Sequence, residues 1–152
     1  MVALYPPLLL LPLFLAIALV LRRLSDDRAV VATGLLFAAT TVTFLHYFVP
    51  LRIDHHNWQL ALLALSMASI AEPKRVRGGL ILGISSALSL AIGLEMIIYL
   101  ALAGAAMVLF WVDDAEEAER LRAYALSLSG GIAFSFLVFA SYDNSGPVCD
   151  AL

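Results

Sequence analysis

Charged residues are scarce in this sequence, and cysteine is almost absent. Asp, Glu, Lys and Arg make up 14% of the 152 residues, whereas 62% are hydrophobic. Soluble domains carry about 25% charged and about 45–50% apolar residues. The composition therefore argues against a soluble globular enzyme and indicates an integral membrane protein. The single cysteine, Cys149, excludes an internal disulfide and with it a disulfide-rich scaffold.

Several functional signatures are also missing from the sequence. No basic patch with interleaved aromatic residues occurs, so we expect no nucleic-acid partner. The sequence contains no GxSxG, HExxH, P-loop or GxGxxG motif. The net charge of −3 says little about partners, because the position of each Lys and Arg decides how a membrane protein is oriented.

Apolar stretches alternate with short polar loops along the whole chain. A helix that crosses a bilayer needs about 20 apolar residues, so a chain of this length holds about six spans. The pattern predicts an all-α, polytopic transmembrane helix bundle that forms a single domain over residues 1–152. The predicted spans lie at about 4–21, 29–49, 58–71, 78–93, 96–112 and 121–141.

The longest apolar run extends from Gly78 to Val112 and contains one charged residue, Glu95. A single helix of that length would measure about 52 Å, well over the hydrocarbon core of about 30 Å. We therefore expect the run to break into two helices close to Gly93–Glu95.

Basic residues gather in three loops. The segments 22–28, 72–77 and 113–122 hold every Lys and Arg except Arg52. Six spans place these loops on one side of the membrane, and the positive-inside rule makes that side the cytoplasm. We expect a bacterial inner (plasma) membrane protein whose segment 50–58 and Glu95 face the periplasm or exterior.

Asp54, His55 and His56 form the densest cluster of side chains that bind metals. Asp54 and His56 are two positions apart, so on an extended turn both point the same way and can hold one ion, while His55 points away. The alternative is an interfacial polar loop whose histidines contact water.

Two further residues belong to the same predicted side. Glu95, alone between apolar helices, is expected to face a cavity or a partner, as a metal ligand, a general base or an ion-pair partner of Arg52. The alternative is an interfacial helix-capping acid. Arg52 is suited to bind a phosphate with two parallel hydrogen bonds, and Trp58 to lie in an interfacial aromatic belt.

The segment RIDHHNWQ resembles the second acidic motif of GT-C class membrane glycosyltransferases. It is most similar to the oligosaccharyltransferase catalytic subunit and its bacterial relatives. Asp54 and His56 match the metal-binding pair of that family, and Gln59 stands near a position where many members have an acid. The following apolar run resembles the paired helices after that motif, so the resemblance covers about residues 40–112.

The resemblance implies transfer of a sugar from a polyprenyl-phosphate-linked donor at the external face. It assigns a divalent metal, Mg²⁺ or Mn²⁺, to Asp54 and His56, phosphate contacts to Arg52 or His55, and a catalytic role to Glu95. The family also needs a second metal-binding Asp and an acceptor-binding motif that this sequence lacks, so we expect the chain to act with the remainder of a longer chain. Two alternatives remain: a transporter or channel subunit with Asp54 and Glu95 in an ion pathway, and a non-catalytic structural membrane subunit.

Overall fold

The computed structural model describes residues 5–41, 47–49 and 55–139, and all regular structure within them is helical. The prediction of an all-α chain is therefore confirmed. The helices are α1 (Tyr5–Leu8), α2 (Leu10–Leu24), α3 (Arg28–Thr40), α5 (His56–Ile70), α6 (Arg75–Ile92), α7 (Ile97–Asp113) and α8 (Ala118–Phe139), with a short 3₁₀ turn, η2 (Ala115–Glu117), between the last two.

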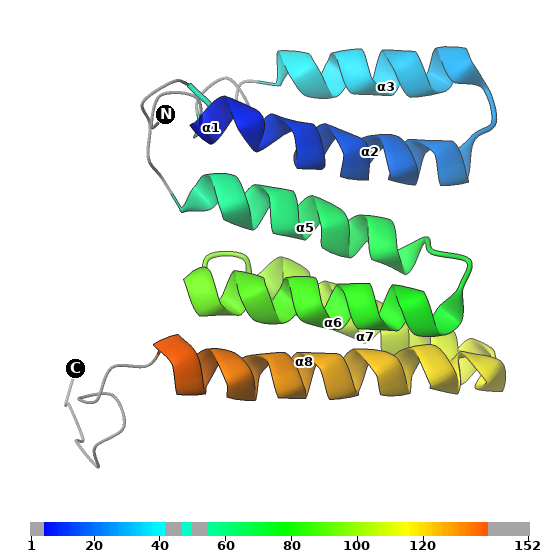
Figure 1. Ribbon diagram of the computed structural model, residues 1–152. Helices are drawn as coiled ribbons and strands as arrows, with labels where there is room; N and C mark the ends of the chain where they lie inside the picture. The colour runs from blue at the N-terminus through cyan, green and yellow to red at the C-terminus, as the bar shows by residue number, and fades with distance from the viewer. Residues whose placement is uncertain (1–4, 42–46, 50–54, 140–152) are drawn as a thin grey trace.

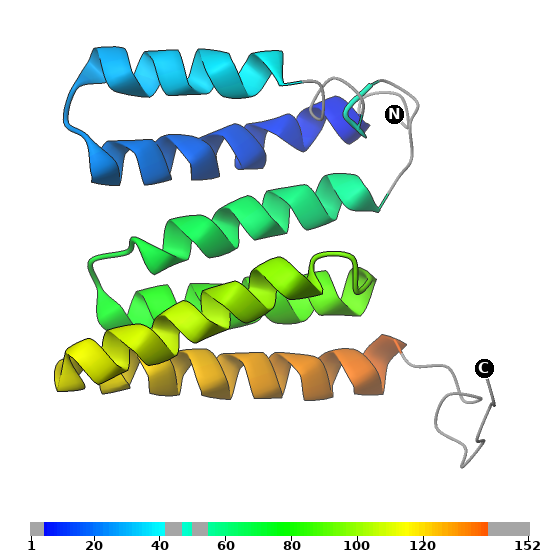
Figure 2. The same cartoon turned by 180° about the vertical axis from the view of Figure 1, so that it is seen from behind.

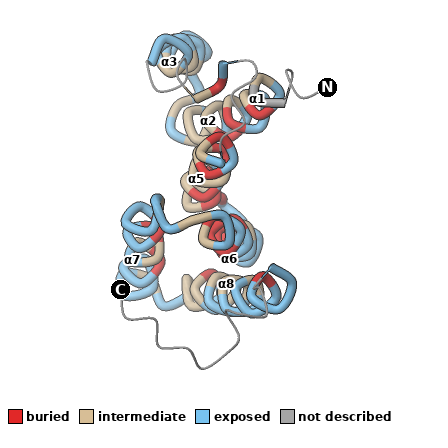
Figure 3. The backbone as a smooth tube through the Cα atoms, turned by 90° about the vertical axis from the view of Figure 1, so that its left-hand side faces the viewer, coloured by how far each residue is buried: buried red, intermediate tan, exposed pale blue. Residues whose placement is uncertain are grey.

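The long helices lie side by side and alternate in direction (Figures 1 and 2). Viewed along the helices, α3, α2, α5, α6 and α8 follow one another in a column, and α7 lies beside α6 and α8 (Figure 3). Because neighbouring helices run in opposite directions, the connections between them lie alternately at the two ends of the bundle. The two ends carry different polar side chains.

The break that we expect beside Glu95 is confirmed. Helix α6 ends at Ile92, α7 begins at Ile97, and a tight turn joins them. Gly93 in this turn allows a close approach by α5, because a Cβ there would lie 3.0 Å from Gln59 Nε2 and would also collide with the Glu95 carboxylate. The turn therefore presses against the first part of α5.

The second predicted span is shorter in the structure than the sequence pattern suggested. We expect a helix over 29–49, but α3 ends at Thr40 and Thr41 has extended backbone angles. The hydroxyls of Thr40 and Thr41 both donate to the carbonyl of Phe37, at 2.9 and 3.1 Å. Such back-bonding competes with the helical hydrogen bonds, which explains an end at this point.

Two arginines cap the carboxyl end of α5. Arg23 donates to the carbonyl of Ala68 and forms an ion pair with Glu72. Arg120 donates to the carbonyls of Ile70 and Glu72, at 3.2 and 2.9 Å. The last carbonyls of a helix have no partner within it, and the helix dipole favours cations there. These contacts connect α2 and α8 to α5.

A second ionic network lies at the same end. The guanidinium of Arg75 donates to Asp114, Glu116 and Glu117, at 3.0, 2.6 and 2.9 Å, and Glu117 also pairs with Arg120 at 2.5 Å. The three basic loops thus lie at one end of the bundle (Figure 1), because α3 and α5 separate the first from the second, α6 and α7 separate the second from the third, and each pair runs out and back. Which side of a membrane this end faces stays a prediction.

Large apolar side chains cover much of the outside of the bundle. Leu137 and Leu126 of α8 are 81% and 75% exposed, and Phe37 of α3 is 77% exposed. Within the part of the chain that the structure describes, two helical segments have the length and hydropathy of a membrane span, Arg75–Ile92 and Ala115–Phe139, and the second is largely exposed. Helices α3 and α7 are apolar but shorter, so the six-span bundle stays a prediction.

Candidate metal centre

His55 and His56 lie at the start of α5, at the end of the bundle opposite the ionic networks. His55 has helical backbone angles, and its carbonyl accepts hydrogen bonds from the amides of Trp58 and Gln59, at 3.1 and 3.2 Å. The ring centroids of His55 and His56 are 4.3 Å apart. The ring of His56 also stacks on that of Tyr47, with 5.2 Å between the centroids.

This geometry corrects the expectation that His55 points away from His56. That expectation assumed an extended turn, in which successive side chains diverge. His55, directly before α5, instead has helical backbone angles, and its ring lies beside that of His56, the first residue of the helix. Asp54 and Arg52 lie outside the described residues, so their predicted roles as metal ligand and phosphate contact stay predictions.

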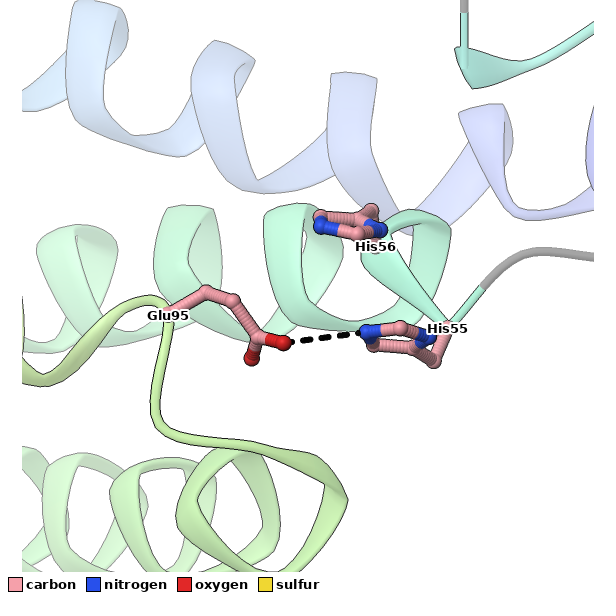
Figure 4. A group of neighbouring side chains, drawn as sticks. All are labelled: His55, His56 and Glu95. Atoms are coloured by element: carbon pink, nitrogen blue, oxygen red, sulfur yellow. Dashed lines mark hydrogen bonds and ion pairs between the residues drawn. The ribbon is translucent and has the colours of Figure 1, made fainter.

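Glu95 reaches this site from the α6–α7 turn. One carboxylate oxygen, Oε1, lies 3.2 Å from His55 Nε2, and the other, Oε2, accepts a hydrogen bond of 2.7 Å from Gln59 Nε2. Figure 4 shows Glu95 facing His55, with His56 next to them. Glu95 therefore lies at the same end of the molecule as the two histidines, as the alternation of spans predicts.

The environment of Glu95 stabilises its charged form. The hydrogen bond from Gln59 is the largest cause that lowers the pKa of Glu95 to about 2, followed by a backbone hydrogen bond and by the bond to His55. The carboxylate is thus ionised at neutral pH. General bases work best with a pKa near the operating pH, so this environment favours a ligand role for Glu95 over a general-base role.

The three side chains have a geometry close to that of a metal site. One ligand atom from each of His55, His56 and Glu95 lies within 4.8 Å of the others. Donors held at about 2.1 Å from one ion lie at most about 4.2 Å apart, so a small side-chain rotation suffices. With a proton on Nε2, His55 donates to Glu95, and an ion bound between them would replace that proton.

The chemistry of the donors distinguishes between the two expected ions. Mg²⁺ prefers oxygen ligands in a nearly ideal octahedron, whereas imidazole nitrogen suits transition metals. Two imidazoles and one carboxylate therefore fit Mn²⁺ better than Mg²⁺.

A polar interior continues from the site along α5 and α6. Gln59, Ser86 and Ser89 are almost fully buried, and among the described residues Gln59 Oε1 and the hydroxyl oxygens of both serines have no hydrogen-bond partner. Further along, the hydroxyls of Ser66 and Ser85 lie 2.7 Å apart. Buried polar atoms in proteins are nearly always hydrogen-bonded, to water where no side chain reaches them.

The sequence alone did not single out Gln59 as the residue that holds Glu95. The available signal was its position four residues after His55, which places both on one face of a helix, together with the prediction that Glu95 lies at the same end of the bundle. Compared with protein-family models, curated proteins and solved structures, the chain matches none. The resemblance to membrane glycosyltransferases over about residues 40–112 therefore stays an expectation from the sequence.

Proposed function

We propose that this chain is the membrane-embedded part of a metal-dependent glycosyltransferase of the GT-C type. It would transfer a sugar from a polyprenyl-phosphate-linked donor at the end of the bundle that carries His55, His56 and Glu95. The observation that best supports this proposal is the convergence of these three side chains from segments about forty positions apart in the sequence.

The surface of the bundle supports its placement in a membrane. Exposed apolar side chains on α3, α7 and α8 are costly in water and favourable in lipid. Helix α6 has 18 residues and is about 27 Å long, close to the thickness of a hydrocarbon core. Trp58, near the start of α5, and Trp111, near the end of α7, are 41% and 46% exposed. These two helix ends lie at opposite ends of the bundle (Figure 1), so the two side chains fit two interfacial aromatic belts.

This placement brings the proposed site to the level where a lipid-linked donor carries its phosphate. The chain of such a donor lies among the lipid tails and its phosphate lies at the interface. A divalent ion held by His55, His56 and Glu95, with Asp54 as a further ligand from the motif, would neutralise charge on the departing phosphate. We place the three basic loops at the other end in the cytoplasm, so the site faces the exterior.

Metal binding tests the proposal directly. The purified full chain in detergent should bind Mn²⁺, seen as loss of the free-ion signal in electron paramagnetic resonance. Glu95→Gln and His56→Ala should each weaken binding at least about tenfold, while Glu119→Gln, an exposed acid near the other end, should leave it unchanged. Equal affinity in all of these variants would refute the site.

Activity tests the enzyme part separately. In a full-length protein that contains this chain, Mn²⁺-dependent consumption of a polyprenyl-phosphate-linked sugar should be lost in the Asp54→Ala and His56→Ala variants. Retained activity in both variants would show that the reaction does not use this centre.

A second function has one observation in its favour. The buried, unpartnered polar atoms of Gln59, Ser86 and Ser89 next to Glu95 are a feature of ion pathways as well as of hydrated sites. An ion transporter predicts flux through proteoliposomes that falls in Glu95→Gln and in a Ser86→Ala/Ser89→Ala double variant. Ion flux without consumption of a lipid-linked sugar donor would favour the transporter over the enzyme.

A further inference from the structure

A polar cavity lies at the end of the bundle opposite the candidate metal centre. It has a volume of about 580 Å³ and is formed where α2 turns into α3. Its polar lining comes from Arg22, Ser25, Asp26 and Arg28, and its apolar wall, which includes Leu35, comes from α3. Cavities of about 300–1,000 Å³ are typical of small-molecule sites.

The charged side chains that line this cavity make none of the polar contacts that connect the described helices. The neighbouring Arg23 is bound to Ala68 and Glu72, and Asp27 caps α3 by accepting a 2.8 Å hydrogen bond from the amide of Ala29. In contrast, the side chains of Arg22, Asp26 and Arg28 form no hydrogen bond or ion pair with any residue in the described ranges 5–41, 47–49 and 55–139. All three are exposed at the mouth of the cavity.

The two signs of charge define what the cavity can bind. Two guanidiniums, one from each helix, match the oxygens of a phosphate, which arginine binds with two parallel hydrogen bonds. One free carboxylate beside them matches an ammonium group. The apolar wall continues into Leu36, which lies one turn after the lining residue Ala32, is 67% exposed and is suited to contact an acyl chain.

We propose that this cavity binds the headgroup of phosphatidylethanolamine. Arg22 and Arg28 hold the phosphate, and Asp26 accepts a hydrogen bond from the primary ammonium. Phosphatidylcholine carries a quaternary ammonium without N–H groups, and phosphatidylglycerol carries no ammonium, so neither satisfies Asp26. Basic pockets at the ends of membrane helices are established sites for lipid headgroups. The inference rests on the membrane placement of the proposed function and is independent of its enzymatic part.

Lipid retention by the purified full chain tests this inference. The protein in detergent receives phosphatidylethanolamine, phosphatidylcholine or phosphatidylglycerol with identical acyl chains, and native mass spectrometry counts the retained lipid. We expect phosphatidylethanolamine to be retained at least about fivefold better than the other two, the factor expected for one charged contact near a membrane surface. Equal retention of the three lipids overturns the proposal.

Variants assign the preference to named groups. Asp26→Asn should abolish the preference for phosphatidylethanolamine over phosphatidylglycerol, and Arg22→Gln/Arg28→Gln should lower retention of all three lipids. The matched control is Arg77→Gln, because Arg77 is an exposed arginine in the first turn of α6 and does not line the cavity. A preference that survives Asp26→Asn, or falls equally in Arg77→Gln, refutes the assignment.

Two further measurements keep the outcomes distinct. Arg22→Lys/Arg28→Lys keeps the charge and removes the bidentate geometry, so a folded variant, checked by circular dichroism, should retain less lipid than the unchanged chain. Binding of free phosphoethanolamine with equal affinity would contradict a lipid site. Failure of the chain to fractionate with membranes would refute the membrane placement itself, whereas loss of Mn²⁺ binding would leave this inference untouched.

Discussion

The Glu95 carboxylate shows how one hydrogen bond decides the chemistry of a residue. Exposed and beside His55, it would be expected to titrate near the ordinary value for glutamate. The bond from Gln59 instead lowers its pKa to about 2. Gln59 is fully buried, so its amide is held in place by the packing of α5 and is ready to donate to the carboxylate.

Replacing Gln59 tests this effect. In Gln59→Leu, the pKa of Glu95 should rise from about 2 toward 4.5, because the largest stabilising contact of the charged form is gone. The ¹³C carboxyl chemical shift of Glu95, followed from pH 7 to pH 2 in detergent, measures it. An unchanged titration in Gln59→Leu would mean that another contact holds the charge.

The same shift predicts how the stability of the chain depends on pH. A carboxylate with a lowered folded-state pKa stabilises the fold fully above the ordinary value of 4.5, and this contribution is lost as the pH falls toward 2. Glu95→Gln should therefore reduce thermal stability at pH 7 and flatten the loss between about pH 4.5 and pH 2. Thermal unfolding of both proteins across this range checks the sign; an equally steep loss in Glu95→Gln would contradict it.

At the level of the elements, glycine and arginine fix how the helices pack. Gly79 and Gly83 lie on the face of α6 that meets α8, where a Cβ at Gly79 would lie 2.9 Å from the Ala123 Cβ. Small residues spaced in this way let two membrane helices approach closely. The packing of α6 on α8 therefore tolerates no side chain at these positions.

Gly83→Ala should destabilise the chain by about 1–3 kcal/mol. The new Cβ would lie 2.7 Å from the backbone nitrogen of Leu128 and from the carbonyl of Tyr124, and neither can move without shifting α8. Gly130→Ala is the matched control, because nothing lies within 4 Å of its Cβ position. It should be neutral or stabilising by up to about 1 kcal/mol. Similar unfolding curves for the two variants would contradict this close packing.

Arg120 should be the most sensitive of the arginines to replacement. It is buried, it donates to the carbonyl of Ile70 at the end of α5 and to that of Glu72 just after it, and it pairs with Glu117. Arg120→Gln should cost about 3 kcal/mol, as loss of one partner of a buried ion pair does. Arg122→Gln, two positions away and exposed, should cost less than about 0.5 kcal/mol. Unfolding in detergent compares the two variants. Equal losses of stability would contradict this structural role of Arg120.

Across the whole molecule, the features that follow from chain length and alternation could be predicted from the sequence. The break at Gly93–Met96 follows from a run too long for one helix. The meeting of the three basic loops at one end follows from short connections between successive helices. The proximity of Glu95 to His55 follows from the same alternation.

The features that depend on contacts distant in sequence could not be predicted. Arg23 and Arg120 were interpreted only as charges that set orientation, because their partners lie 45 to 50 positions away. The early end of α3 depends on threonine hydroxyls that could equally have bonded within a longer helix. The orientation of His55 depends on where α5 begins, and helix ends are the least certain part of any sequence pattern.

The orientation of the whole bundle is open to a labelling experiment. In a Cys149→Ser background, Leu94→Cys places a thiol in the exposed α6–α7 turn, and Glu119→Cys places one near the start of α8 at the other end. With the basic loops in the cytoplasm, a membrane-impermeant maleimide on intact cells should label the Leu94→Cys protein only, and both proteins after permeabilisation. The reverse pattern would turn the bundle over and place the candidate metal centre inside the cell, away from an external donor. Labelling of both positions in intact cells would show that the two ends of the bundle are not separated by a bilayer, and the membrane placement would fail with it.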